Sequence, residues 1–149
     1  MRKLFLIITL VLLSSSVKAE DTTLINQLEK QLNACSDTFE QREKECPESW
    51  SFKCYNHLMS AHREVQTCYK KVAVELFHKF YNLSETEATQ KFDNYAKFIY
   101  EQYLFIFAET DYCNKENCGV SVYLYSEYAT SQQIFYYVNK IIGSISARN

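Results

Sequence analysis

Residues 76–92 read LFHKFYNLSETEATQKF, and this stretch contains the clearest boundary between two helices in the chain. Ser84 is followed three residues later by Glu87. This is the spacing of a capping box, in which the two side chains satisfy free backbone N–H groups at the start of a helix. The pattern predicts one helix that stops near Asn82 and a second helix that Ser84 opens.

Apolar residues on both sides of this boundary recur every three or four positions, as on one face of an α-helix. The stripe before it is Leu58, His62, Val65, Cys68, Tyr69, Val72, Leu76 and Phe80. The stripe after it is Ala88, Phe92, Tyr95, Ala96, Ile99, Tyr103, Ile106 and Phe107. Residues 103–108 are apolar on every side, which suits a buried helix end or a short strand, and we favour the helix.

Two further helices are expected nearer the ends of the chain. One ends at Pro47 and has the stripe Leu24, Leu28, Leu32, Cys35, Phe39 and Cys46. Residues 120–125 alternate weakly like a strand, and a last helix is expected over about Ser126 to Ile145. Because the chain has two glycines and one proline, helices should dominate. We predict an all-α fold, a small disulfide-stapled bundle of about four helices.

The first nineteen residues have the three parts of a secretory signal peptide. These are basic Arg2 and Lys3, an apolar run over 4–13, and small residues at Val17 and Ala19. The apolar run is shorter than the roughly 20 residues that span a bilayer. We therefore expect residues 1–19 to be removed and residues 20–149 to form a single helical domain, periplasmic or secreted, with no membrane span.

Removal of that segment leaves 13 basic against 18 acidic residues, a formal charge of −5. Nucleic acids and anionic membrane surfaces both attract clustered Lys and Arg, so this charge disfavours them as partners. A cationic protein is easier to accommodate.

No arrangement of residues indicates catalysis or a bound cofactor. Cys54, His57, His62 and Cys68 are of the types that zinc prefers, but their spacing matches no compact finger, and export favours oxidised cysteines. The chain has no Gly-x-Ser-x-Gly or Cys-His signature of a nucleophile. We expect no enzyme, no metal and no cofactor.

The helix boundary also carries a second motif. Asn82-Leu83-Ser84 matches the acceptor for N-linked glycosylation, at a turn where a glycan has room. Capping explains Ser84 without a glycan, so both interpretations remain open.

Six cysteines in an exported chain predict disulfides, with fifteen possible pairings. They are Cys35, Cys46, Cys54, Cys68, Cys113 and Cys118. If residues 56–83 form one unbroken helix, the α-carbons of Cys54 and Cys68 are about 21 Å apart, and a bridge needs about 7 Å or less. An antiparallel hairpin with the preceding helix would then nest Cys46–Cys54 inside Cys35–Cys68.

A series of residue types extends over Phe52–Ile142. Its members are Cys54, Glu64-Val65-Gln66-Thr67-Cys68, Glu75-Leu76, Tyr81, Cys113, Gly119-Val120-Ser121 and Tyr128. In order and spacing the series resembles the LprI-type lysozyme inhibitors, a family of exported bacterial proteins. The family's Trp-x-x-Tyr-Arg-Asp is absent, since residues 105–111 read FIFAETD, and the helix with Cys35 and Cys46 has no equivalent there.

The resemblance implies a Cys54–Cys68 disulfide, with the chain turning near Met59-Ser60 so that the helix starts there. Cys35–Cys46 and Cys113–Cys118 would follow, and we prefer these three pairs to the nested ones. The resemblance also implies an exported binding protein that inhibits a lysozyme or another exported hydrolase. The alternative is a structural or assembly subunit of a periplasmic or secreted complex.

Lysozymes are typically cationic and have carboxylates in the cleft, so a chain of charge −5 would be steered toward them. Two segments are candidates for contact with such a partner. The first is the loop of Asn114, Lys115, Glu116 and Asn117, held if Cys113 and Cys118 bond. The second contains Glu45, Glu48 and Trp50.

Overall fold

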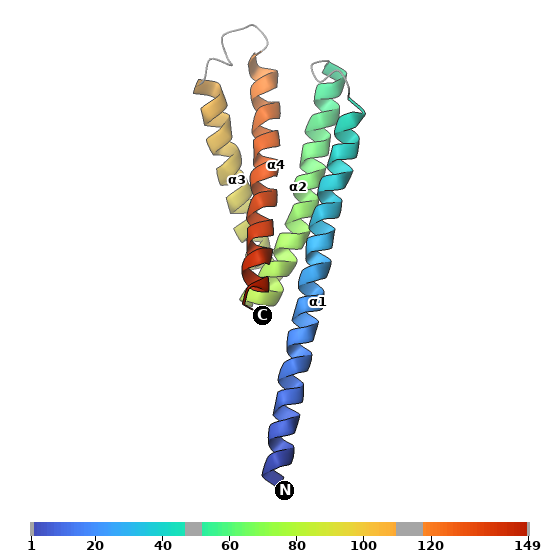
Figure 1. The fold of residues 1–149 in the computed structure, drawn as a ribbon. Coiled ribbons are helices and arrows are strands. Elements are labelled where there is room, and N and C mark those ends of the chain that lie inside the picture. Colours follow the sequence, from blue (N-terminus) through green and yellow to red (C-terminus); the bar gives the residue numbers. More distant parts are fainter. Residues whose placement is uncertain (1, 47–51, 110–117, 149) are drawn as a thin grey trace.

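The computed structural model describes residues 2–46, 52–109 and 118–148, and their side chains except at 2–20, 52–53, 109 and 118–121. Four helices follow in order: α1 (Arg2–Lys44), α2 (Phe52–Tyr81), α3 (Glu85–Glu109) and α4 (Cys118–Ser146). Figure 1 shows them running alternately up and down as two hairpins, α1–α2 and α3–α4, which lie side by side. The predicted all-α, disulfide-stapled bundle of about four helices is confirmed.

The core lies where the two hairpins meet, and α2 and α4 are central because each of them contacts the other three helices. Every helix contributes fully buried side chains: Leu28, Leu32, Ala73, Leu76, Ala88, Ile134 and Val138. Burying a side chain such as Leu or Ile contributes roughly 1.5–3 kcal/mol. The helical stripes in the sequence are the rows of residues that form this core.

The N-terminal part of α1 runs past the end of the other three helices (Figure 1). The first buried residue described on α1 is Ile25. Within the described residues, no helix combines the length and the apolar character that a membrane span requires. Cleavage after residue 19 stays a prediction.

The junction between α2 and α3 has the predicted capping box. The backbone N–H of Ser84 donates to Glu87 Oε2 at 2.9 Å, and the backbone N–H of Glu87 donates to Ser84 Oγ at 3.3 Å. Just before it, Asn82 has φ of 54°, in the left-handed region that commonly ends a helix. The boundary deduced from the sequence is therefore confirmed.

Residues 120–125 belong to α4, so the expected strand-like segment there is wrong. Val122, Ser126 and Thr130 are buried at intervals of four residues, as a helix requires. The hydroxyls of Ser126 and Thr130 donate to the carbonyls one turn earlier, at 2.8 and 2.6 Å. The alternation of apolar and polar residues over 120–125 was too short to outweigh the four-residue spacing that continues through the helix. Residues 103–108 are helical, as predicted.

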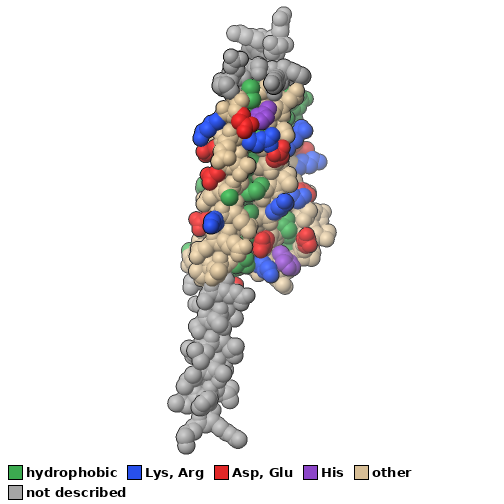
Figure 2. All heavy atoms as spheres, turned by 90° about the vertical axis from the view of Figure 1, so that its right-hand side faces the viewer, with side chains coloured by type: hydrophobic (Ala, Val, Ile, Leu, Met, Phe, Trp, Pro, Cys, Tyr) green, Lys and Arg blue, Asp and Glu red, His purple; other side chains and the backbone are tan. Residues whose placement is uncertain are grey.

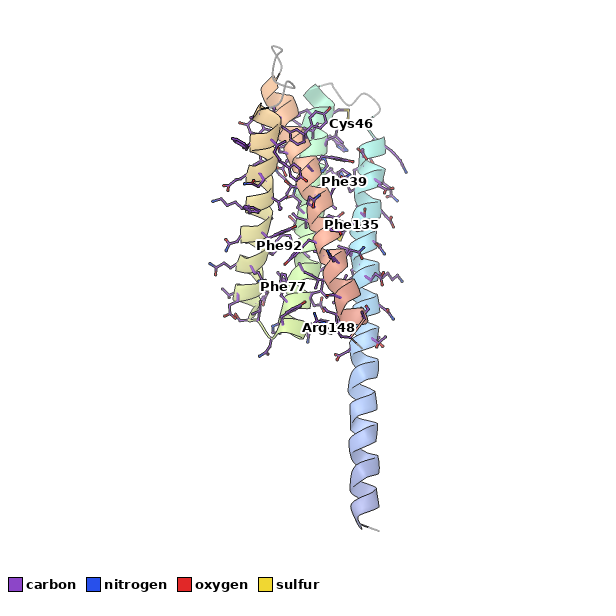
Figure 3. All side chains as sticks on the ribbon, turned by 60° about the vertical axis from the view of Figure 1, so that its left-hand side comes forward. Phe39, Cys46, Phe77, Phe92, Phe135 and Arg148 are labelled. Carbon is purple, nitrogen blue, oxygen red and sulfur yellow. A yellow bond between two sulfur atoms is a disulfide. The ribbon has the colours of Figure 1, made fainter. Side chains whose placement is uncertain are left out.

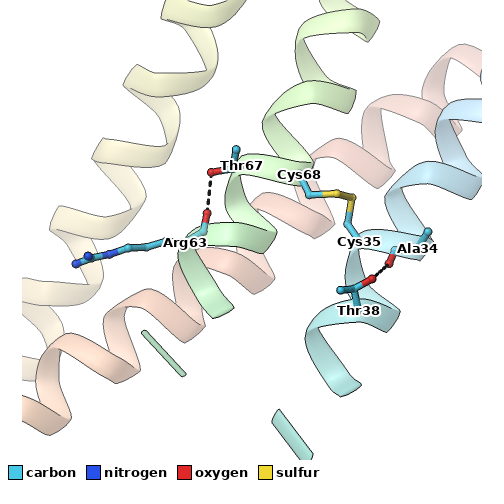
Figure 4. The surroundings of a disulfide bond; sticks show 6 residues. All are labelled: Ala34, Cys35, Thr38, Arg63, Thr67 and Cys68. Carbon is cyan, nitrogen blue, oxygen red and sulfur yellow. Dashed lines mark hydrogen bonds between the residues drawn. A yellow bond between two sulfur atoms is a disulfide. The ribbon is translucent and has the colours of Figure 1, made fainter. Parts of the chain in front are cut away.

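The disulfides are Cys35–Cys68, with α-carbons 5.9 Å apart, and Cys46–Cys54, with α-carbons 5.5 Å apart. The preferred pairs Cys54–Cys68 and Cys35–Cys46 are wrong. The physical reason is that α2 runs unbroken through Met59-Ser60, which separates Cys54 and Cys68 by about 21 Å. The nested pairing expected for an antiparallel hairpin is the one found, and Figure 4 shows its outer bond, Cys35–Cys68. The predicted Cys113–Cys118 bond lies outside the described residues.

Candidate binding pocket between three helices

A pocket of about 310 Å³ lies where α1, α2 and α4 meet, and we call it the His62 pocket. Its residues come from helical positions three or four apart on each helix. They are Ser36, Phe39, Glu40 and Glu43 on α1; His62, Val65 and Tyr69 on α2; and Tyr128, Ser131, Gln132 and Phe135 on α4. Figure 3 labels Phe39 and Phe135, which mark two of its walls. Three helices therefore each present one face to the same space.

The buried side of the pocket is polar and centred on the hydroxyl of Ser131. This hydroxyl donates to the backbone carbonyl of Glu127 at 2.9 Å and accepts from Gln66 Nε2 at 3.1 Å. His62 Nδ1 lies 3.3 Å from the same oxygen. Because a hydroxyl has one proton to donate, Nδ1 of His62 must be the donor in this contact. The ring is thereby assigned the tautomer that leaves a lone pair on Nε2.

Nε2 of His62 forms no hydrogen bond with any described residue. Those residues leave no fully enclosed side-chain nitrogen or oxygen without a partner, so Nε2 must reach open space. His62 lines the pocket, which provides that space. The pocket thus contains one hydrogen-bond acceptor on an otherwise buried ring.

His62 is neutral near pH 7, because burial lowers its pKa from 6.5 to about 4. His62 is 3 % exposed, and its ring packs against Phe39, with centroids 4.5 Å apart. Tyr128 meets it edge-on at 5.7 Å. A neutral imidazole therefore forms part of an aromatic wall.

The pocket carries negative charge at its rim. Glu40 and Glu43 are exposed, stand three residues apart on α1, and have no ion pair within the described part of the chain. Burial raises the pKa of the Tyr69 hydroxyl, a hydrogen bond with Ser36 opposes this, and the charge of Glu40 adds to the rise. Tyr69 therefore stays protonated and uncharged. The rim is acidic while the interior is neutral and aromatic.

Among the described residues no Lys or Arg lines the pocket, and two arginines of α1 and α2 are engaged in ion pairs outside it. Arg63 lies 3.6 Å from a carboxylate oxygen of Glu127, and Arg42 pairs with Glu64. Glu127 also accepts a hydrogen bond from Gln66 at 2.8 Å. The two rim carboxylates are thus the charges that the pocket can offer a ligand.

Ser131 and His62 are not arranged as a nucleophile and its base. The proton of Ser131 points to a backbone carbonyl, and Glu127 contacts Gln66 and Arg63 instead of orienting the imidazole. Among the described residues, no group of three His, Cys, Asp or Glu side chains could hold a metal ion.

A second hollow, of about 390 Å³, follows the outer groove between α1 and α2, beside the Cys35–Cys68 disulfide. Small residues such as Ala34 and Ala61 leave this space. Figure 2 shows the same face, where hydrophobic side chains are bordered by charges of both signs. Its charged groups include the Arg42–Glu64 ion pair, which already satisfies both partners. The groove thus offers a ligand apolar contact with less directional chemistry than the His62 pocket.

Of the predicted contact residues, Glu45 alone lies in the described part of the chain, and it does not line this pocket. Glu45 is exposed and lies 3.5 Å from His57 Nε2. Glu48, Trp50, Asn114, Lys115, Glu116 and Asn117 lie outside the described residues. Sequence reasoning missed the pocket, although one signal was present. His62 interrupts an apolar stripe, and a polar residue at such a position indicates a buried polar contact.

Comparison of the chain with protein-family models, with curated proteins and with solved structures finds no match. The likeness to the LprI-type inhibitors therefore stays a resemblance in residue types and spacing.

Proposed function

We propose that the chain is an exported, disulfide-stabilised binding protein that takes a basic group of its partner into the His62 pocket. The observation that carries the proposal is the combination of an acidic rim and aromatic walls. A cation is attracted electrostatically by both carboxylates, and also by the faces of aromatic rings whose centroids lie within about 6 Å. The N–H groups of a lysine or arginine side chain could also donate to Nε2 of His62.

A cationic exported protein is the class of partner that this site suits. The expected mature charge of −5 would speed encounter with such a protein, by long-range attraction that weakens as salt rises. A lysozyme is the first candidate, and the sequence resemblance supports that choice. The signal-like N-terminus and the two disulfides support export to a periplasm or the exterior.

The test compares two charge-matched double variants of residues 20–149 in binding a cationic lysozyme, by calorimetry in 0.15 M salt. Glu40→Gln/Glu43→Gln removes the rim charges and should weaken binding about tenfold or more. Glu29→Gln/Glu85→Gln removes two exposed charges outside the pocket and should weaken binding much less.

Equal losses in the two variants would mean that net charge alone acts, and the pocket would be rejected. Unchanged lysozyme turnover at micromolar excess of the native protein would remove lysozyme inhibition.

An assembly subunit is the second candidate, and the outer face of α3 favours it. Phe98 is 57 % exposed, Phe105 is 66 % exposed, and the two stand seven residues apart on one side of the helix. Exposed aromatic side chains of this kind mark many protein contacts. Light scattering after size exclusion distinguishes the candidates: a stable oligomer at micromolar concentration that Phe98→Ser/Phe105→Ser dissociates favours assembly.

A further inference from the structure

The turn between α2 and α3 presents an asparagine whose side chain the fold does not use. Asn82 follows the last residue of α2 with φ of 54°, and the backbone N–H of Leu83 donates to the carbonyl of Phe77 at 3.3 Å. This bond joins residues six apart and ties the turn back to the last turn of α2. Glycine or asparagine commonly occupies the left-handed position at the end of a helix. The backbone conformation therefore explains why position 82 is one of these two residues, but it does not favour asparagine over glycine.

The side chain of Asn82 is exposed and makes no hydrogen bond with the described residues. The folded protein can therefore carry a glycan on this amide without loss of packing. Asn82-Leu83-Ser84 is also the only Asn-x-Ser or Asn-x-Thr in the whole sequence. The acceptor sequence thus coincides with a solvent-facing turn.

We propose that Asn82 is an N-linked glycosylation site, modified from a lipid-diphosphate-linked oligosaccharide as the chain is exported. The amide nitrogen of Asn82 bonds to C1 of the first sugar, and the bond from C1 to the diphosphate oxygen breaks. The lipid diphosphate leaves with that electron pair, and one amide proton is released. The proposal rests on the export proposed above and not on the partner.

The timing of the transfer follows from Ser84. In the folded protein its hydroxyl donates to Glu87 Oε2 at 2.7 Å and accepts from the backbone N–H of Glu87. The acceptor serine is thus engaged once α3 is capped. Transfer therefore precedes the capping of α3, while the chain is still entering the compartment.

A glycan at Asn82 leaves the His62 pocket open. Tyr69 is the pocket residue of α2 nearest to Asn82 in sequence, and thirteen residues of helix separate them by about 20 Å. Figure 1 shows the α2–α3 turn at the end of the bundle opposite to the α1–α2 loop. The glycan would cover the end of the bundle near the C-terminus.

The experiment is cell-free translation of the full 149-residue chain with microsomes from a secretory cell. We expect a protease-protected product whose mass falls on treatment with peptide-N-glycosidase, which leaves aspartate at position 82. Asn82→Gly keeps the turn and should abolish the mass change. Ser84→Thr keeps both the cap and the acceptor sequence, and should retain it.

Two results would overturn the proposal, and they are distinguishable. A protected chain with unmodified Asn82, beside a control protein that the same microsomes glycosylate, removes the glycan and leaves export standing. A chain that stays accessible to protease removes export as well. Because the transfer precedes folding, the variants report on the acceptor and not on stability.

Discussion

The two hairpins of the bundle are stabilised in different ways. Two disulfides and the Arg42–Glu64 ion pair join α1 to α2. In the described parts of α3 and α4, ring contacts hold the pair instead, including Tyr95–Tyr137 with centroids 4.2 Å apart. Among the described residues, disulfides reinforce the packing of the first hairpin only, so we expect reduction and mutation to affect the two hairpins unequally.

The difference also places the candidate site. The His62 pocket lies at the seam, with two walls on the cross-linked hairpin and one wall on α4. Cross-linking fixes Glu40 and Glu43 relative to His62, because Cys35–Cys68 ties the same stretches of α1 and α2. The position of α4 depends on packing and on polar contacts with α2 such as Gln66–Glu127, so the wall formed by Tyr128 and Phe135 is the one that core mutations should disturb.

The largest expected effect comes from the longer of the two disulfide loops. Cys35–Cys68 spans 33 residues and Cys46–Cys54 spans 8. Because a disulfide restricts the unfolded chain, the first bond should contribute about 4 kcal/mol to the free energy of unfolding and the second about 2.5 kcal/mol. Cys35→Ala/Cys68→Ala should therefore lower the free energy of unfolding more than Cys46→Ala/Cys54→Ala, as measured by urea denaturation.

Equal losses of unfolding free energy in the two double variants would contradict the explanation that the disulfides stabilise the protein by restricting the unfolded chain. A larger loss from the shorter loop would show that the end of the hairpin, and not its middle, limits stability.

The second effect concerns pH and the seam between the hairpins. Burial lowers the pKa of His62 to about 4 in the folded protein, against 6.5 in an unfolded chain. The unfolded chain therefore binds more protons between these values, so stability is complete above pH 6.5 and falls as the pH drops toward 4. The full difference corresponds to about 3 kcal/mol.

Urea denaturation at several pH values measures this dependence. His62→Phe keeps an aromatic ring beside Phe39 and Tyr128 but cannot titrate, so it should flatten the slope between pH 6.5 and 4. A slope as steep as that of the native protein would show that other groups cause the loss.

The third effect is at the junction between the hairpins. Ser84→Ala removes the side chain that accepts from the N–H of Glu87, and should cost about 1 kcal/mol of stability. Ser84→Thr retains a capping hydroxyl, so its stability should stay within about a few tenths of a kcal/mol of that of the native protein. Thermal unfolding of the three proteins checks the order, and a threonine variant as unstable as the alanine variant would contradict it.

The features that could be predicted from the sequence are those set by residues close together along the chain. The capping box and the apolar stripes depend on residues within one or two turns, so the α2–α3 boundary and the fold class followed from them. The disulfides depended on whether α2 passes through Met59-Ser60 without a break, which local patterns left open. The His62 pocket depended on the register of α4 against α2, since Ser131 lies 69 residues from His62. No local pattern encodes that register.

The smallest expected effect tests the hairpin that is held by packing. Tyr95 on α3 and Tyr137 on α4 are stacked, and such aromatic pairs contribute about 0.5–1.5 kcal/mol beyond the area they bury. In a double-mutant cycle of Tyr95→Leu and Tyr137→Leu, we expect a coupling near the lower end of that range, because both rings are partly exposed.

The matched control for this cycle is Tyr136, which is next along α4 and 59 % exposed. Its cycle with Tyr95 should give a coupling close to zero, because successive residues point to different sides of a helix. Equal coupling in both cycles would mean that α4 shifts as a whole when Tyr95 is lost. In that case the α3–α4 hairpin would depend on the overall fit of the two helices, and the single stacked pair would not hold it.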